Sequence, residues 1–365
     1  MTTGEELYLQ GKLDDAWPKL QEEAKSGSGR AKYIIGQYYL QGHGHIQRNP
    51  IEGSFWFAKG ADEDALACIG LHFFTKESGR DDEGKFKAAL QNAERRAAAG
   101  DVLALSALSY VYRLGVKSWV TVDRARGLSY LAKAADLGYW QAENDLGLLY
   151  LNGEEVTKDE AKGAALLEKA AAKGIGMSEY HMAYCYLTGT GVEQNISKGI
   201  GHYQKAWKHG NTKAAVELGM KYETGDGVRK DLKKAYQLYK KAAEAGDVEA
   251  KGHAADCLWA GAGIKMDRKS AARLYKEGEK AGDAYAITRL GQIDFEKQDY
   301  MAAFNHFLVA ARLQFPVAQY LTGMCLIRGL GVEENRENGI QWLRQAALNG
   351  NGEAAAALQN MGNGN

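Results

Sequence analysis

Small and apolar residues recur along this chain at a nearly constant interval. The best-formed repeat begins at Ala214 and reads AAVELGMKYETGDGVRKDLKKAYQLYKKAAEAGDVE, and its opening small residue returns every 36 residues from Ala142 to Ala286. Self-similarity at a fixed period of about 20–50 residues is the sequence signature of a stacked repeat protein. A degenerate repeat from Glu5 to Gly27 is followed by nine full repeats, which open at Ala31, Ala65, Ala104, Ala142, Ser178, Ala214, Ala250, Ala286 and Ala318, with a last opening residue at Ala354.

The positions inside a repeat predict a helix–turn–helix. Counting the opening residue as position 0, position 4 is apolar, position 5 is small and position 8 is usually a ring, as in Leu218, Gly219 and Tyr222. Positions 0, 4 and 8 lie on one face of a helix, and a small residue at position 5 allows a neighbouring helix to approach closely. In the second half, Asp231 is expected to cap a helix that ends before Gly246. Such a pair buries its apolar face only by stacking on its neighbours.

The pattern A-x-x-x-L-G-x-x-Y-x-x-G-x-G-V-x-x-D-x-x-K-A-x-x-x-Y-x-K-A-A-x-x-G resembles the Sel-1-like repeat family, a relative of tetratricopeptide repeats. The match is specific in the repeats from Ser178, Ala214 and Ala318, where the loops begin Gly189-Thr-Gly-Val, Gly225-Asp-Gly-Val and Gly329-Leu-Gly-Val. The resemblance implies an all-α fold, an α/α right-handed superhelix that serves as an adaptor or scaffold for other proteins. We expect a degenerate capping repeat at 1–30, the solenoid at 31–354 and a C-terminal tail at 355–365.

Three repeats depart from the pattern. The repeat from Ala65 carries TKESGRDDEG in place of the glycine loop, and we expect an exposed irregular insert there. The repeat from Ala104 carries LGVKSWVTV, and the shorter one from Ala286 turns at Gln298 and is closer to a plain tetratricopeptide repeat.

Charge and cysteine content exclude several classes of function. The 46 basic residues balance 46 acidic ones, so the basic footprint of a nucleic-acid-binding protein is absent and we expect no nucleic acid partner. No apolar run reaches the length of a membrane span, and no signal peptide pattern opens the chain, which predicts a cytoplasmic protein without membrane insertion. Cys185, Cys257 and Cys325 share one helical register but lie two repeats apart, too far to pair. We therefore expect buried free thiols, and no disulfides.

Catalytic and metal-binding patterns are also missing from the sequence. No serine has a lysine three residues on and no G-x-S-x-G occurs, although some members of the family have been described as β-lactamase-like. The G-x-G-V loops follow helices, whereas a phosphate-binding glycine loop follows a strand. His43 and His45 are near enough to share a metal ion, but no third ligand accompanies them, and we favour a surface loop. We expect no catalytic residue, no cofactor and no metal.

The first helix of each repeat is expected to line a concave face, on which positions 2, 6 and 9 form a stripe distinct from the core. This stripe is rich in rings and methionine, which favours an extended peptide or a helix of a partner protein. The alternative is that tyrosines at position 2 pack between adjacent repeats. A signalling or secretion regulator and a toxin-neutralising immunity protein both fit such a groove, and a β-lactamase-like hydrolase is the weaker alternative. The predicted groove residues are Tyr33, Phe74, Tyr110, Leu148, Tyr180, Tyr184, Leu187, Met220, Trp259, Phe295, Tyr320 and Met324.

Overall fold

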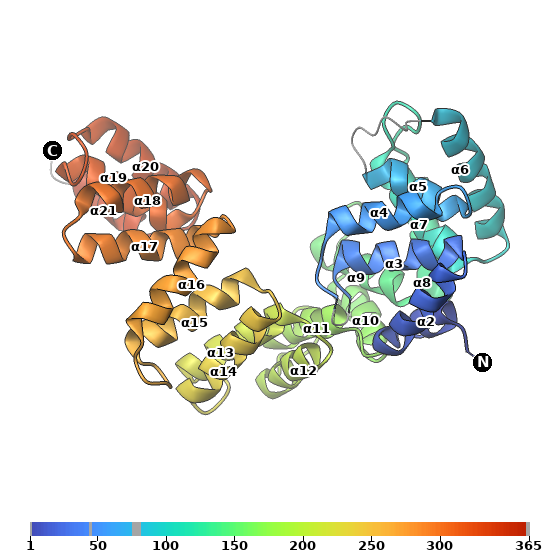
Figure 1. Ribbon diagram of the computed structural model, residues 1–365, viewed down its shortest axis with the longest axis horizontal. Coiled ribbons are helices and arrows are strands. Elements are labelled where there is room, and N and C mark those ends of the chain that lie inside the picture. Colours follow the sequence, from blue (N-terminus) through green and yellow to red (C-terminus); the bar gives the residue numbers. More distant parts are fainter. Residues whose placement is uncertain (1, 44–45, 75–81, 363–365) are drawn as a thin grey trace. The chain divides into compact units, whose positions relative to one another are not determined.

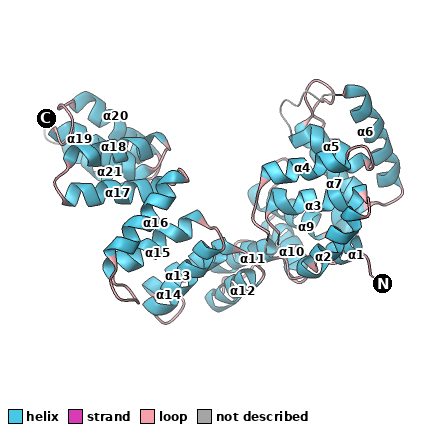
Figure 2. Cartoon of the chain, viewed as in Figure 1, coloured by secondary structure: helices cyan, strands magenta, loops and turns pink. Residues whose placement is uncertain are grey.

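The computed structural model describes residues 2–43, 46–74 and 82–362, and the regular structure in these ranges is helical (Figure 2). The predicted all-α class is therefore confirmed. The contacts divide the chain into two compact units, Met1–Ala215 and Val216–Asn365, and each is described by itself. The expected insert of the repeat from Ala65 lies mostly outside the described residues.

The helices follow one another in pairs along the chain (Figure 1). The N-terminal unit contains α1 (Gly4–Leu9), α2 (Leu13–Lys25), α3 (Gly29–Gln41), α4 (Pro50–Gly60), α5 (Ala65–Phe74), α6 (Glu83–Ala98), α7 (Val102–Leu114), α8 (Arg124–Asp136), α9 (Trp140–Asn152), α10 (Glu160–Ala171), α11 (Gly176–Thr188) and α12 (Ile196–Lys208). Helix α13 (Thr212–Thr224) begins in this unit and ends in the next. The C-terminal unit continues with α14 (Leu232–Glu244), α15 (Val248–Ala260), α16 (Arg268–Lys280), α17 (Ala284–Glu296), α18 (Tyr300–Arg312), α19 (Pro316–Arg328), α20 (Arg336–Leu348) and α21 (Gly352–Gly362).

The predicted repeats are these helix pairs. Within the described ranges, the nine repeats opening at Ala31 to Ala318 form the pairs α3/α4 to α19/α20, and α1/α2 is the shortened pair before them. The expected tail is helical in α21, whose Leu358 and Met361 pack against a cluster around Leu343. The end of the described chain is thus the first helix of one more, incomplete repeat.

Small residues at position 5 allow the two helices of a repeat to touch. A Cβ atom added to Gly36 would lie 2.4 Å from Cε1 of Phe57, and one added to Gly219 would lie 2.4 Å from Cε1 of Tyr239. Both rings are fully buried. The helix ends also follow the sequence: the Asp231 carboxylate accepts the Lys234 N–H at 3.0 Å, and Gly246 has φ +92°.

The N-terminal helix pair docks on a repeat far along the chain. The buried Tyr8 places its hydroxyl 3.2 Å from the hydroxyl of Tyr139, 131 residues later, and its carbonyl accepts the Trp140 indole N–H at 2.9 Å. Gly11 lies against the next repeat, where an added Cβ would be 3.1 Å from Cδ1 of Ile175. Through Tyr8 and Gly11, the N-terminal helix pair therefore packs on the beginnings of α9 and α11.

This docking replaces two helix caps. The residues before α3, α7, α15 and α17 are Ser or Asp, and each side chain accepts a backbone N–H of its helix. Before α9 and α11 stand Tyr139 and Ile175, which make no such bond and are buried against the N-terminal pair. An N-cap contributes about 1 kcal/mol. Here burial of apolar side chains takes its place.

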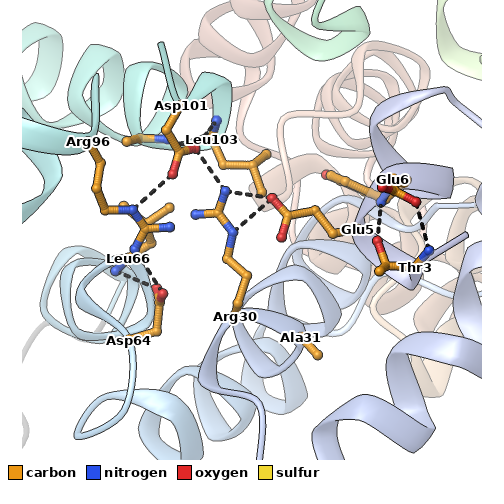
Figure 3. Close-up of polar contacts among 12 residues, drawn as sticks. Thr3, Glu5, Glu6, Arg30, Ala31, Asp64, Leu66, Arg96, Asp101 and Leu103 are labelled. Carbon is orange, nitrogen blue, oxygen red and sulfur yellow. Dashed lines mark hydrogen bonds and ion pairs between the residues drawn. The ribbon is translucent and has the colours of Figure 1, made fainter. Parts of the chain in front are cut away.

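An ion-pair network ties together the first repeats (Figure 3). One nitrogen of Arg30 lies 2.7 Å from Oε1 of Glu5 and 2.8 Å from Oδ1 of Asp101. Arg96 joins Oδ2 of Asp101 and Oδ2 of Asp64, both at 2.9 Å (Figure 3). Asp64 and Asp101 also accept backbone N–H groups at the starts of α5 and α7. The caps of two helices are thereby coupled to arginines from α3 and α6.

We expect an Asp101→Asn variant to be less stable than the native chain, with a deficit that shrinks in acid. Burial opposes ionisation of this carboxyl, but Arg30 and Arg96 outweigh it and hold its pKa below the ordinary 3.8. A lowered pKa stabilises the fold above the ordinary value, and that contribution is lost as the pH falls through the folded value. The deficit should be about 1–3 kcal/mol at neutral pH. Urea unfolding at about pH 7 and about pH 3 measures it; an equal deficit at both would contradict this account.

Candidate partner-binding groove

Position 2 of the first helix is mostly buried, which corrects part of the predicted stripe. Tyr33 is only 3% exposed, and its ring packs 5.7 Å from that of Phe57. Ser106, Asn144 and Thr288 occupy the same position in other repeats and are buried too. Tyr33 is therefore a packing residue on Phe57 of its own helix pair, although it borders the cavity described next, and its place in a partner-binding surface stays a prediction. Positions 6 and 9 are half-buried or exposed in most repeats.

A cavity of about 290 Å³ lies over α3, α5 and α7 in the N-terminal unit. The predicted groove residues Phe74 and Tyr110 line it, and the buried Tyr33 also borders it. Its other walls are largely apolar and include Leu40, Ile69, Phe73, Val111 and Leu114. The Tyr110 hydroxyl donates to Oδ2 of Asp145 at 2.5 Å, which fixes the ring.

Two further predicted residues meet in a second hollow of the same unit. Leu148 of α9 and Tyr184 of α11 line a cavity of about 380 Å³ with a polar rim that includes Lys158 and Glu160. Tyr184 is 54% exposed, so most of its ring is available for contact. Tyr180 and Leu187 do not join them: the Tyr180 ring packs 5.6 Å from that of Tyr203, and Leu187 lies against Gly199.

Three predicted residues converge in the C-terminal unit. Phe295 of α17 and Tyr320 and Met324 of α19 line a cavity of about 440 Å³, together with the fully buried Phe307. Arg289 and Arg328 stand among its polar walls. Met220 and Trp259 are half-buried outside this cavity, and the guanidinium of Arg268 covers the Trp259 ring at 5.0 Å. That Tyr184, Met220 and Trp259 form one continuous surface stays a prediction.

Position 3 carries polar residues that the sequence reasoning missed. Asp145, His181, Glu217, His253 and Arg289 follow one another at intervals of 36 residues, and all are half-buried rather than buried. In the N-terminal unit, the Nδ1–H of His181 donates to Oδ1 of Asn144 at 3.1 Å, and burial lowers the pKa of His181 to about 4. In the C-terminal unit, Arg289 pairs with Asp256 at 2.7 Å. The recurrence of five polar residues at the same position of successive repeats could have predicted that position 3 is accessible.

A surface loop was expected at His43, and this expectation is wrong. His43 is part of a buried aromatic cluster. Its ring lies 5.0 Å from that of Trp140 and 5.6 Å from that of Tyr38, and burial lowers its pKa to about 3. His45 lies outside the described residues. Among those described, no group of three or more His, Cys, Asp or Glu side chains is placed to hold a metal ion.

The cysteines are buried and unpaired, as predicted. Burial raises the pKa of the Cys185 and Cys325 thiols to about 11 and that of Cys257 to about 12. A thiol with so high a pKa is protonated at neutral pH and is a poor nucleophile. In the described part of the chain, no helix combines the length and the apolar character that crossing a membrane requires.

The family model described as Sel1 repeat matches eight segments of the chain. They are residues 29–64, 102–139, 140–175, 176–211, 212–247, 252–283, 284–315 and 316–351. The matches leave out α5 and α6, which belong to the repeat whose loop departs from the pattern.

Solved structures share the fold. The chain is similar to a protective antigen of uropathogenic Escherichia coli that displays an SLR fold, with 26% identity over 96% of this chain and 77% of that one and a TM-score of 0.61. A Sel1 repeat protein from Oxalobacter formigenes is 22% identical over 97% of this chain and 93% of that one, with a TM-score of 0.57. An immunity protein from Pseudomonas aeruginosa is 19% identical over 60% of this chain and 81% of that one, and its TM-score of 0.39 is too low to bear on function.

Proposed function

The chain belongs to the Sel1 repeat family, and from this premise we propose that it is a non-catalytic adaptor that holds a partner protein or peptide on its first helices. The observation that carries the proposal is the grouping of predicted residues: Phe295, Tyr320 and Met324 come from two adjacent repeats and line one cavity. Half-exposed rings and methionines in a hollow are typical of surfaces that anchor a partner's side chains.

The N-terminal unit supports the same proposal, because Leu148 and Tyr184 also share a hollow there. Four buried free thiols fit a reducing compartment, so we propose a cytoplasmic protein that acts in signalling or secretion. The balance of 46 basic and 46 acidic residues supports a protein partner rather than a nucleic acid.

Photo-crosslinking tests which face holds the partner. A photoreactive amino acid placed at Tyr184 or Phe295 should capture one and the same protein in the source cell. The matched controls are Gln204 of α12 and Asn305 of α18, exposed positions on the second helix of the same two repeats. Capture of that protein from the control positions, or from neither groove position, would contradict the proposal.

Truncation of Tyr184 should separate binding from stability. Because most of this ring is exposed, Tyr184→Ala should change the free energy of unfolding by no more than about 0.5 kcal/mol. It should weaken the binding of the crosslinked partner at least about tenfold, since an aromatic anchor contributes about 2 kcal/mol or more to binding. The fully buried Tyr239 is the control, and Tyr239→Ala should lose about 3–5 kcal/mol of stability. Equal destabilisation by the two variants would show that Tyr184 is a packing residue.

A further inference from the structure

A small cavity lies where the N-terminal helix pair and the first full repeat meet three later repeats. It measures about 70 Å³ and belongs wholly to the N-terminal unit. Its walls come from segments far apart in the sequence: Leu13, Gln41–His43, the first turns of α9, the start of α11 and the loop after α12. The docking of the N-terminal helix pair, through Leu13, therefore helps to build a site that no single repeat could form.

Two of the lining residues carry polar atoms without partners. His43 and His209 line the cavity, and each has a buried ring nitrogen, Nε2 and Nδ1 respectively, that has no hydrogen-bond partner. The His43 side chain is only 9% exposed. Buried polar groups are nearly always hydrogen-bonded, and an orphaned atom calls for an explanation. Two such atoms on the residues that line one cavity favour a polar group there.

Asp145 also lines this cavity, and its carboxylate is not paired with any lysine or arginine of the described chain. Its hydrogen-bond donors are neutral: the Tyr110 hydroxyl at 2.5 Å and the Asn144 amide at 3.3 Å. Among the described residues it makes no ion pair, and burial raises its pKa above the ordinary 3.8. A half-buried carboxylate in this state lacks the counter-charge that normally accompanies it.

The neighbouring cations are already engaged elsewhere. Arg113 pairs with Glu155 at 2.8 Å, and Lys173 pairs with Glu143 at 2.5 Å. His181 and His43 are neutral at physiological pH, because burial lowers the pKa of each. Burial raises the pKa of Asp145 and outweighs the charge of Arg113, which lowers it, so the carboxylate is only partly compensated.

Asp256 in the C-terminal unit shows how this chain completes a comparable carboxylate. It accepts the hydroxyls of Tyr275 and Tyr285, as Asp145 accepts that of Tyr110. It differs in having a guanidinium, because Nε of Arg289 lies 2.7 Å from its Oδ1. The cation that Arg289 supplies to Asp256 is what Asp145 lacks.

We propose that this cavity binds a primary ammonium group, held by the Asp145 carboxylate and by the unpartnered imidazole of His43. A volume of about 70 Å³ is roughly that of two water molecules in the liquid, which fits an ammonium and the methylene beside it. Asp145 supplies the charge, and the neutral imidazole of His43 offers a nitrogen lone pair to an N–H. A small free amine and the lysine side chain of a peptide share this chemistry.

Thermal unfolding of the full chain in n-propylammonium chloride tests the proposal. The midpoint should rise saturably relative to sodium chloride at equal ionic strength, and n-propanol should produce no such rise. Asp145→Asn should weaken the binding at least about tenfold. Asp256→Asn is the matched control, a carboxylate on tyrosine hydroxyls outside the cavity, and it should leave the affinity unchanged. No saturable rise, an equal rise with n-propanol, or an undiminished rise in Asp145→Asn would overturn the proposal.

A second measurement on the native chain guards against a misfolded variant. The ring proton signals of His43, assigned through a His43→Gln variant, should shift on titration with n-propylammonium, while those of His306 in the C-terminal unit should not. Absence of a His43 shift would overturn the proposal. The acetylated and amidated tripeptide Gly-Lys-Gly is the second probe, and stronger binding of the peptide than of the free amine would assign the ammonium to a lysine side chain. This site is separate from Tyr184 and Phe295, so its failure would leave the adaptor proposal intact.

Discussion

Replacing Trp140 with alanine should lower the free energy of unfolding of the N-terminal unit by about 3–5 kcal/mol. The indole is 2% exposed, and its ring packs 5.5 Å from Tyr8, 5.6 Å from Tyr139 and 5.0 Å from His43. Truncation would open a cavity among these rings and leave the Tyr8 carbonyl without the indole N–H. Both effects fall on the contact between the N-terminal helix pair and α9.

Hydrogen exchange and urea unfolding measure this loss. Amide protection should fall in α1 and α2 and change little in α15 to α20, because those later helices belong to the other compact unit of the chain. Trp140→Phe is the control, since it keeps a ring but removes the N–H, and it should lose much less. A loss below about 1 kcal/mol for Trp140→Ala would mean that the N-terminal pair is only loosely docked.

The repeat register could be predicted from the sequence because it depends on short-range rules. The cap at Asp231, the glycine after the helix at Gly246 and the small residue at Gly219 each act within one helix pair. Their recurrence at 36 residues transfers the interpretation of one repeat to the next. The same rules predicted that the cysteines are buried and free, since residues in one register two repeats apart cannot meet.

The docking of the N-terminal pair could not be predicted in this way. It joins Tyr8 to Tyr139 across 131 residues, and no periodic rule relates these positions. A local signal existed, however, because Tyr139 and Ile175 stand where neighbouring repeats carry a capping Asp or Asn. Phe315 before α19 also lacks a capping bond and packs within the C-terminal unit, so an apolar residue in place of a cap indicates a packed side chain without identifying its partner.

Burial separates position 2 from the rest of the predicted stripe. Positions 2, 6 and 9 were taken as the exposed stripe, but position 2 turns toward the next repeat, as Asn144 shows by accepting the hydroxyl of Ser178. Position 3 is the more accessible of the two from Asp145 onward. One residue rotates the side chain by about 100° around a helix, so the choice depends on how tightly the repeats stack. That packing is a tertiary property.

The two glycines of a G-x-G loop should differ in how much stability is lost when each is replaced by alanine. Gly329 and Gly331 both have positive φ, +64° and +74°, where an added side chain costs about 1–2 kcal/mol. The nearest atom to a Cβ at Gly329 would be 3.6 Å away, whereas a Cβ at Gly331 would be 1.9 Å from the carbonyl oxygen of Tyr300. Tyr300 begins the second helix of the preceding repeat, so Gly331 alone is a point of contact between repeats.

Gly331→Ala should therefore cost about 1–3 kcal/mol more than Gly329→Ala, because backbone must move at a packed contact. Urea unfolding of the two variants gives the difference, and hydrogen exchange should show the additional loss in α18 and α19. The N-terminal unit supplies an independent replicate, since a Cβ at Gly191 would be 2.0 Å from the Glu160 carbonyl and one at Gly189 would have 3.4 Å of clearance. If both members of each pair cost the same, the second glycine serves only its own backbone conformation, and the G-x-G loop is not what sets the stacking of repeats.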